Sequence, residues 1–157
     1  MNKTVVGIFE SERIAERAIK NLRSAGFERE ISLLARDQSS SDSDDMGGGA
    51  IADGIATGGV LGGLGGLAIG AGALVIPGIG PMIAAGPIAG MLSGVAGGGI
   101  AGGLVDWGIS EDEGRRYEEE IRQDNIIVAV NSSERNIDKA EEILKNHGAS
   151  EVKVHDK

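Results

Sequence analysis

An uncharged, glycine-rich stretch in the middle of the chain limits what the chain can fold into. The run from Gly54 to Val105 contains no Asp, Glu, Lys or Arg, and 19 of the 27 glycines lie between positions 54 and 103. Because glycines four residues apart line one face of a helix and let a second backbone approach closely, this spacing predicts helices that associate through their glycine faces. The glycines form two ladders, Gly54, Gly58, Gly62, Gly66 and Gly70, and then Gly86, Gly90, Gly94, Gly98 and Gly102.

A turn signal separates the two ladders. Proline has no amide proton and its ring clashes with the preceding helical turn, so a helix does not continue through two nearby prolines. The sequence therefore predicts a helical hairpin over residues 54–107, with arms at 54–76 and 82–105. The expected turn residues are Pro77, Gly78, Gly80 and Pro81.

The two charged flanks each have the pattern of a strand, a helix and a second strand. In residues 1–36, apolar runs at 4–9 and 31–35 surround an amphipathic helix that ends at Gly26. In residues 125–157, runs at 126–130 and 152–154 surround another such helix, which ends at Gly148. We therefore expect two βαβ halves, together with a Ser/Asp/Gly linker at 37–53 and a charged helix at 108–124 that begins with a Ser110–Glu113 capping box.

The two halves look like copies of each other. Two βαβ units related by duplication are the components of a ferredoxin-like sheet, and neither unit buries enough surface alone. The predicted fold is thus α+β, a ferredoxin-like split βαβ sandwich with an inserted glycine-zipper helical hairpin. With an offset of 122, Val6-Gly7-Ile8 falls on Val128-Ala129-Val130, Ser11 on Ser133, Ala18 on Ala140, Leu22 on Leu144 and Gly26 on Gly148, and a one-residue slip then brings Ile31 onto Val152.

Composition excludes several classes of partner and chemistry. The net charge of -9 argues against a nucleic-acid partner, and the absence of cysteine excludes disulfides and thiolate sites. The pattern Gly97-x-Gly99-x-x-Gly102 is explained by the ladder, and the weak calcium-loop pattern from Asp42 to Asp53 has Met46 at a ligand position. His147 lies at a helix end, where a cation is favourable, and His155 lies in the last strand. We expect no catalytic, cofactor or metal site and no small-molecule substrate.

The hairpin has three interpretations. Each arm is long enough to cross a hydrocarbon core of about 30 Å, which predicts a membrane-associated hairpin carrying a cytoplasmic domain. No Lys or Arg lies between Arg36 and Arg115, so the cationic flanks typical of a membrane span are missing. The alternatives are a soluble cytoplasmic homo-oligomer, a scaffold, shell or filament whose hairpins form a shared apolar core, and a flexible linker.

The whole pattern resembles the bacterial general stress proteins of the heat- or low-temperature-induced, glycine-zipper type. The resemblance covers most of the chain and is carried by the segment at 76–81, Ile-Pro-Gly-Ile-Gly-Pro, and by the helix start at 108–120, in which Gly114 stands where alanine is more usual. It implies a non-enzymatic, stress-associated structural role and brings no catalytic residues. An enzyme or ligand-sensing domain on the sheet is the third class of function.

Overall fold

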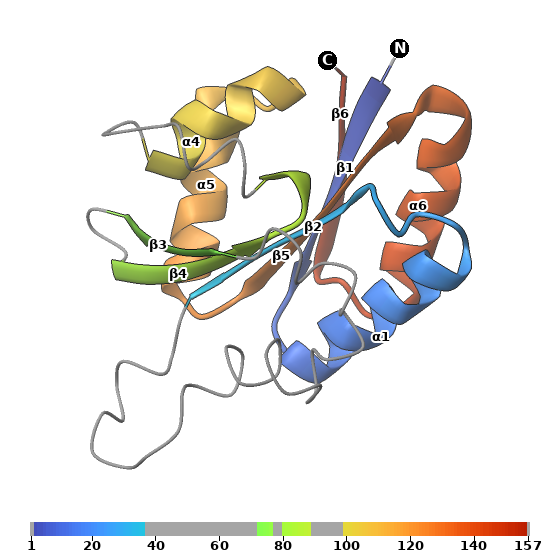
Figure 1. Ribbon diagram of the computed structural model, residues 1–157, viewed down its shortest axis with the longest axis horizontal. Helices are drawn as coiled ribbons and strands as arrows, with labels where there is room; N and C mark the ends of the chain where they lie inside the picture. The colour runs from blue at the N-terminus through green and yellow to red at the C-terminus, as the bar shows by residue number, and fades with distance from the viewer. Residues whose placement is uncertain (1, 37–71, 77–79, 89–98, 157) are drawn as a thin grey trace.

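The computed structural model describes residues 2–36, 72–76, 80–88 and 99–156, which fold into an α+β arrangement around one antiparallel sheet (Figure 1). The described strands follow the order β3-β4-β2-β5-β1-β6 across this six-stranded sheet. In chain order the elements are β1 (Asn2–Phe9), α1 (Glu12–Ser24), β2 (Ile31–Arg36), β3 (Gly72–Ile76), β4 (Gly80–Ala85), α4 (Gly99–Leu104), the 3-10 turn η3 (Val105–Trp107), α5 (Glu111–Arg122), β5 (Ile126–Ser133), α6 (Glu134–Asn146) and β6 (Glu151–Asp156). The strands and helices predicted for the two flanks and the predicted charged helix are confirmed.

The four strands of the flanks are compatible with a split βαβ layout. Their order is β2-β5-β1-β6, with β1 paired to both β5 and β6 and with β2 paired to β5. Strand β1 of the first half therefore lies between β5 and β6, the two strands of the second half. The prediction that the two halves meet in one sheet is confirmed.

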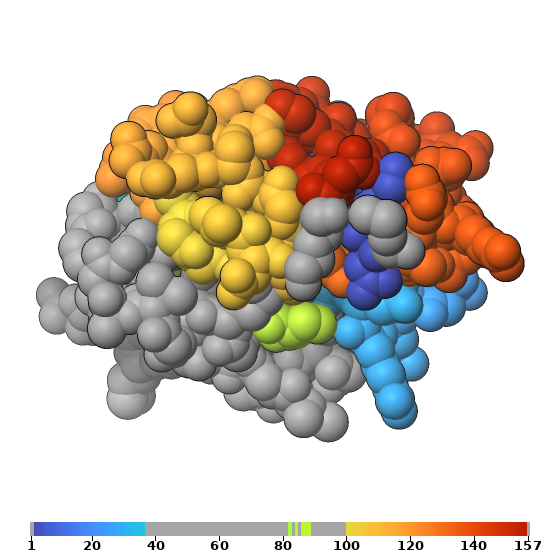
Figure 2. Space-filling view, turned by 90° about the horizontal axis from the view of Figure 1, so that it is seen from above, coloured from blue at the N-terminus to red at the C-terminus, as the bar shows by residue number. Residues whose placement is uncertain are grey.

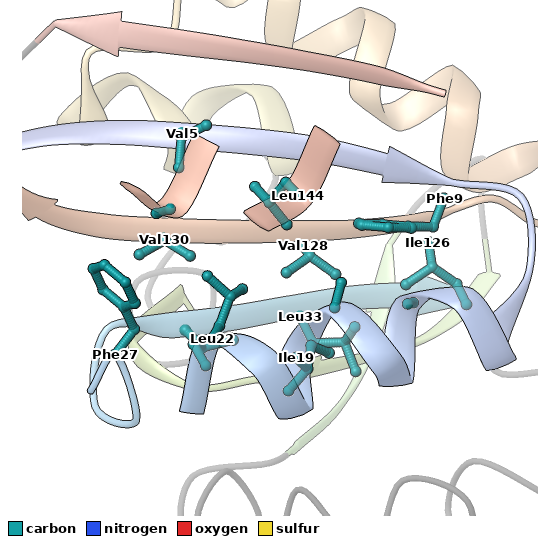
Figure 3. Packing of buried hydrophobic residues seen from close by; sticks show 14 of the residues in the cluster. Val5, Phe9, Ile19, Leu22, Phe27, Leu33, Ile126, Val128, Val130 and Leu144 are labelled. Atoms are coloured by element: carbon teal, nitrogen blue, oxygen red, sulfur yellow. The ribbon is translucent and has the colours of Figure 1, made fainter. Parts of the chain in front are cut away.

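Helices α1 and α6 cover one face of this sheet (Figure 1), and their apolar side chains lie among those of the strands (Figure 3). Both helices place an apolar stripe on the sheet because their aliphatic residues recur every three or four positions. Ala18 and Leu22 of α1 and the corresponding Ala140 and Leu144 of α6 are all fully buried. They pack on alternate residues of the strands, among them Val5, Phe9, Ile31, Leu33, Ile126, Val128 and Val130.

The opposite face of the sheet is also covered, by α5, α4 and η3. The remaining strand residues, such as Val6, Ile8 and Ile127, pack there against Tyr117 and Ile121 of α5. Strands that are buried on both faces read as continuous apolar runs. The uninterrupted apolar runs at 5–9 and 126–130 indicate burial on both faces, which the predicted fold did not include.

The predicted duplication is correct for the helices and wrong by one residue in the first strand. Gly26 and Gly148 both have positive φ, 100° and 88°, and each lies two residues beyond the last residue of its helix. Val6, however, lies on the α5 face, whereas Val128 lies on the α1 face. An offset of 122 therefore aligns residues on one face of β1 with residues on the other face of β5. Successive strand residues point to opposite faces, so only an odd offset can superimpose the two strands.

The helical hairpin prediction is wrong where the structure describes it. Residues 72–76 and 82–85 are strand and belong to an antiparallel β-hairpin, β3–β4, whose second strand pairs with β2. Gly80 and Pro81 begin β4 rather than forming a helix-to-helix turn, and Pro77 and Gly78 lie outside the described residues. The segment 72–76 is Gly-Ala-Leu-Val-Ile, and its aliphatic and β-branched residues favour a strand that extends the sheet.

The second ladder is not one continuous helix. Gly86 has φ +84°, and a Cβ there would lie 2.2 Å from the carbonyl oxygen of Ile31, so this glycine serves a bend pressed against β2. Gly102 lies in the six-residue helix α4 and is exposed. The other eight ladder glycines lie outside the described residues. Within the part of the chain that the structure describes, no helix is long and apolar enough to cross a membrane.

Candidate functional site

The described residues contain a buried chain of polar side chains between α5 and the edge strand β6. The imidazole of His155 lies between two residues of α5, with Nδ1 2.9 Å from Oε2 of Glu113 and Nε2 2.8 Å from Oη of Tyr117. Tyr117 is 2% exposed and His155 is 5% exposed. This Glu113–His155–Tyr117 chain is the candidate functional site.

Local sequence places each member. Glu113 and Tyr117 are four residues apart, so they share one face of α5. In β6, Val152 and Val154 pack towards α1 and α6, which turns His155 to the opposite face. Ser110 starts α5 by accepting a hydrogen bond from the backbone N–H of Glu113 at 3.4 Å, while the Glu113 side chain is directed to β6. The predicted capping box is therefore half formed.

Cations balance the carboxylates around His155. Lys153 pairs with the other oxygen of Glu113, and Arg116 pairs with Glu151. On the neighbouring strand β1, Nζ of Lys3 lies 3.0 Å from Oδ1 of Asp156. The imidazole thus lies among carboxylates that already have a positive partner.

Burial changes the proton affinity of both rings. Burial lowers the pKa of His155 below its ordinary value, Lys153 lowers it further, and Asp156 acts in the opposite direction. Burial, with a further contribution from Glu151, raises the pKa of Tyr117 to about 12. At neutral pH the consistent assignment is a protonated tyrosine and a neutral imidazole, with Nδ1–H donating to Glu113 and the Tyr117 hydroxyl donating to Nε2.

This order of groups resembles an acid–base relay, but its burial favours a structural role. A nucleophile or general base has to reach a substrate, and here the tyrosine hydroxyl faces the histidine inside the helix–sheet interface. Within the described ranges, no group of three or more His, Asp and Glu side chains is arranged to hold a metal ion. These three side chains can therefore hold or release a proton while they fix α5 on β6.

A second contact joins α5 to α4, the helix at the end of the glycine-rich stretch. A Cβ on Gly114 would lie 2.7 Å from Cα of Ala101, so the two helices cross at a distance that only glycine permits. The backbone N–H of Ala101 donates to Oε1 of Glu118 at 2.9 Å. Gly114, which weakens α5 as an isolated helix, is explained by this crossing.

Few of the candidate site residues named from the sequence lie close to one another in the described part of the structure. His147 is at the C-terminal end of α6, as predicted, with Nδ1 2.8 Å from the carbonyl oxygen of Ile143. Gly99 and Gly102 lie within α4, which is not the strand-to-helix turn of a dinucleotide site. The calcium-loop residues from Asp42 to Asp53 lie outside the described residues. The sequence did not predict the pairing of His155 with Tyr117. Its only sign was the alternation of residues in β6, which places His155 on the opposite face from Val152 and Val154.

Comparison with models of protein families, with curated proteins and with solved structures gave no match.

Proposed function

We propose that this chain is a non-enzymatic, stress-associated structural protein that assembles with copies of itself through its glycine-rich central region. In this proposal the flanks form a ferredoxin-like body, and the body carries the assembling segment at one edge of its sheet. The four-residue glycine spacing and the resemblance to general stress proteins support it. So does the burial of His155 and Tyr117, which leaves these two groups inside an interface between elements.

The edge strand β3 is the observation that carries the proposal. Among the described strands, β3 and β6 are the two edges of the sheet. Strand β6 carries Glu151, Lys153 and Asp156, and charges of this kind protect an edge from pairing with another chain. Strand β3, Gly-Ala-Leu-Val-Ile, has no charge, and the uncharged run that precedes it contains the first glycine ladder. The uncharged edge strand is therefore next in sequence to the assembling segment.

A membrane-associated form is the second candidate, and the described residues weaken its two-pass version. Ile88 and Ile100 are both buried in the body, and ten residues, 89–98, connect the described segments to which they belong. As a helix, ten residues extend about 15 Å, half of a hydrocarbon core of about 30 Å. The second predicted arm is thus too short to cross, which favours assembly between copies.

Sedimentation velocity in detergent-free buffer, together with fractionation of carbonate-washed membranes, tests the proposal. We expect a particle much larger than the 16.1 kDa chain and little protein in the membrane fraction. The substitutions Gly62→Leu and Gly94→Leu should dissociate the particle, because leucine blocks close approach of two backbones. Circular dichroism should show that the βαβ body stays folded.

Gly48→Leu is the matched control, because Gly48 belongs to the linker at 37–53 and lies outside both ladders. This variant should leave the particle intact. A monomeric wild-type chain would overturn the assembly proposal, and recovery of the chain in the washed membranes would favour the second candidate.

A further inference from the structure

The buried pair of His155 and Tyr117 has a complete set of hydrogen bonds only when the imidazole is neutral. Neutral His155 donates from Nδ1 to Glu113 and accepts at Nε2 from the hydroxyl of Tyr117, at 2.9 and 2.8 Å. A second proton would turn Nε2 into a donor that faces the tyrosine hydroxyl, which is itself a donor in this arrangement. The Tyr117 oxygen would accept from Nε2, and its hydroxyl hydrogen would have to turn away and lose its acceptor inside an interface where Tyr117 is 2% exposed. Leaving a buried polar group without a partner is unfavourable.

The charges around the ring compensate only in part for an added proton, because Glu113 is shared with Lys153. From α5, the ring faces Glu113, which is paired with Lys153, while Arg116 of the same helix is paired with Glu151. From β1, Thr4 lies opposite His155 in the strand register. Lys3 next to it is paired both with Asp156 of β6 and with Glu134 at the start of α6. A protonated His155 therefore places an additional positive charge in a site whose carboxylates are already matched.

We propose that His155 is a proton-operated latch, which holds α5 on β6 at neutral pH and releases it in acid. The latch belongs to the folded body and does not depend on the proposed self-assembly. Release of α5 also loosens α4, because Ala101 of α4 packs against Gly114 and donates its backbone N–H to Glu118. Acid would thus free the described end of the glycine-rich region. Figure 2 shows α5 in orange and β6 in red side by side on one surface of the molecule.

The direction of the pH effect follows from linkage. The pKa of His155 in the folded chain is below its ordinary value of 6.5, so the unfolded or released state binds more protons in the window between the two values. The contribution of neutral His155 is complete above the ordinary pKa. It is lost as the pH falls through that window towards the lower folded value.

Amide hydrogen exchange of the full chain, corrected for the intrinsic rate at each pH, measures the latch. The protection of α5 is compared with that of α1, which lies on the other face of the sheet and serves as the internal reference. Between about pH 7.5 and about pH 5, the ratio of α5 to α1 protection should fall, with a slope of at most about tenfold per pH unit for one proton. A constant ratio would overturn the proposal.

Substitution of the histidine gives the first check. In His155→Gln the side chain stays neutral at every pH, so the ratio should no longer depend on pH, whatever its absolute value. His147→Gln removes the other histidine, at the end of α6, and should keep the wild-type dependence. The proposal is wrong if His155→Gln retains the wild-type pH dependence.

Lys153→Gln tests the charge balance without touching the buried ring. The Lys153 side chain is 48% exposed, so this variant should fold. Without Lys153, Glu113 becomes an unmatched carboxylate, and the pKa of His155 should rise by about 1 unit. The titration is followed by NMR in a His147→Gln background, where His155 is the only imidazole.

Lys145→Gln is the matched control, since Lys145 forms a comparable exposed ion pair with Glu141 on α6, which packs on the other face of the sheet. It should leave the His155 titration in place. An unchanged pKa of His155 in Lys153→Gln would contradict the charge-balance argument.

Discussion

The two faces of the sheet are covered in different ways. On one face, α1 and α6 occupy corresponding places in the two halves, are buried through the same pairs of Ala and Leu residues, and end at a glycine with positive φ. On the other face, α5 and α4 have no such counterpart, and their contacts include a buried histidine chain and a close helix crossing at Gly114. A duplicated sequence thus built the first face from repeated apolar contacts. The second face depends on single residues of particular shape and proton affinity, which makes it the more sensitive to pH.

The largest effect is expected on the duplicated face. Leu22→Ala and Leu144→Ala each remove a fully buried side chain, and each should lower the free energy of unfolding by about 2–5 kcal/mol. Because the two positions correspond, the two losses should agree within about 1 kcal/mol in urea denaturation. Clearly unequal losses would mean that the two halves share a sequence pattern without sharing its energetics.

The next effect concerns the polar chain on the other face. Tyr117→Phe leaves Nε2 of buried His155 without its hydrogen-bond partner, which should cost about 1–3 kcal/mol at about pH 8. The loss should shrink towards about pH 5, where the wild-type chain no longer gains from a neutral imidazole. Denaturation at both pH values measures it, and a loss that is the same at both would separate Tyr117 from the titration of His155.

A smaller effect is expected at the crossing of α4 and α5. Gly114→Ala raises helix propensity by about 1 kcal/mol, but the added Cβ would lie 2.7 Å from the backbone of Ala101, and such overpacking costs about 1–3 kcal/mol. We expect a net loss of about 1 kcal/mol in urea denaturation. A stabilised variant would instead show that α4 and α5 can move apart to accept the added methyl group.

The smallest effect is expected where α5 ends. Asp124 occupies the position that Gly26 and Gly148 hold after α1 and α6, and it has φ 64°. Asp124→Gly should stabilise the chain by about 0.5–1 kcal/mol through relief of this conformation, reduced by loss of the exposed ion pair with Arg36. Asp124→Ala loses the same ion pair and keeps the strained conformation, so it should be less stable than Asp124→Gly in thermal unfolding. Equal stabilities would show that φ at this turn has no measurable cost.

The duplicated face could be predicted from the sequence because its information is local and repeated. The period of the apolar residues in α1 and α6 identified the buried stripes, and the glycines at 26 and 148 identified the helix ends. The strand offset was wrong by one residue because apolar residues fill both faces of β1 and β5, so their sequence has no alternation to fix the register.

The second face could be predicted only in part: the charged helix at 108–124 was expected, but its contacts were not, for two physical reasons. The rotation of α5 about its axis is set by tertiary packing, and only that rotation brings Tyr117 and Glu113 to His155. The residues at 72–76 and 82–85 also had a glycine-rich context that suits closely packed helices. Pairing of β4 with β2 and of β3 with β4 supplies the backbone hydrogen bonds that overrode this preference.

The position of β1 between β5 and β6 also has a consequence for the synthesis of the chain. The shortest separation in the β1–β5 ladder, from Phe9 to Ile126, is 117 residues. At about 5–20 residues per second, a ribosome needs about 6–23 s to make that stretch. During this time β1 has neither of its neighbouring strands, and the uncharged glycine-rich segment emerges before the sheet can close. The nascent chain should therefore be the form of this protein that depends most on chaperones.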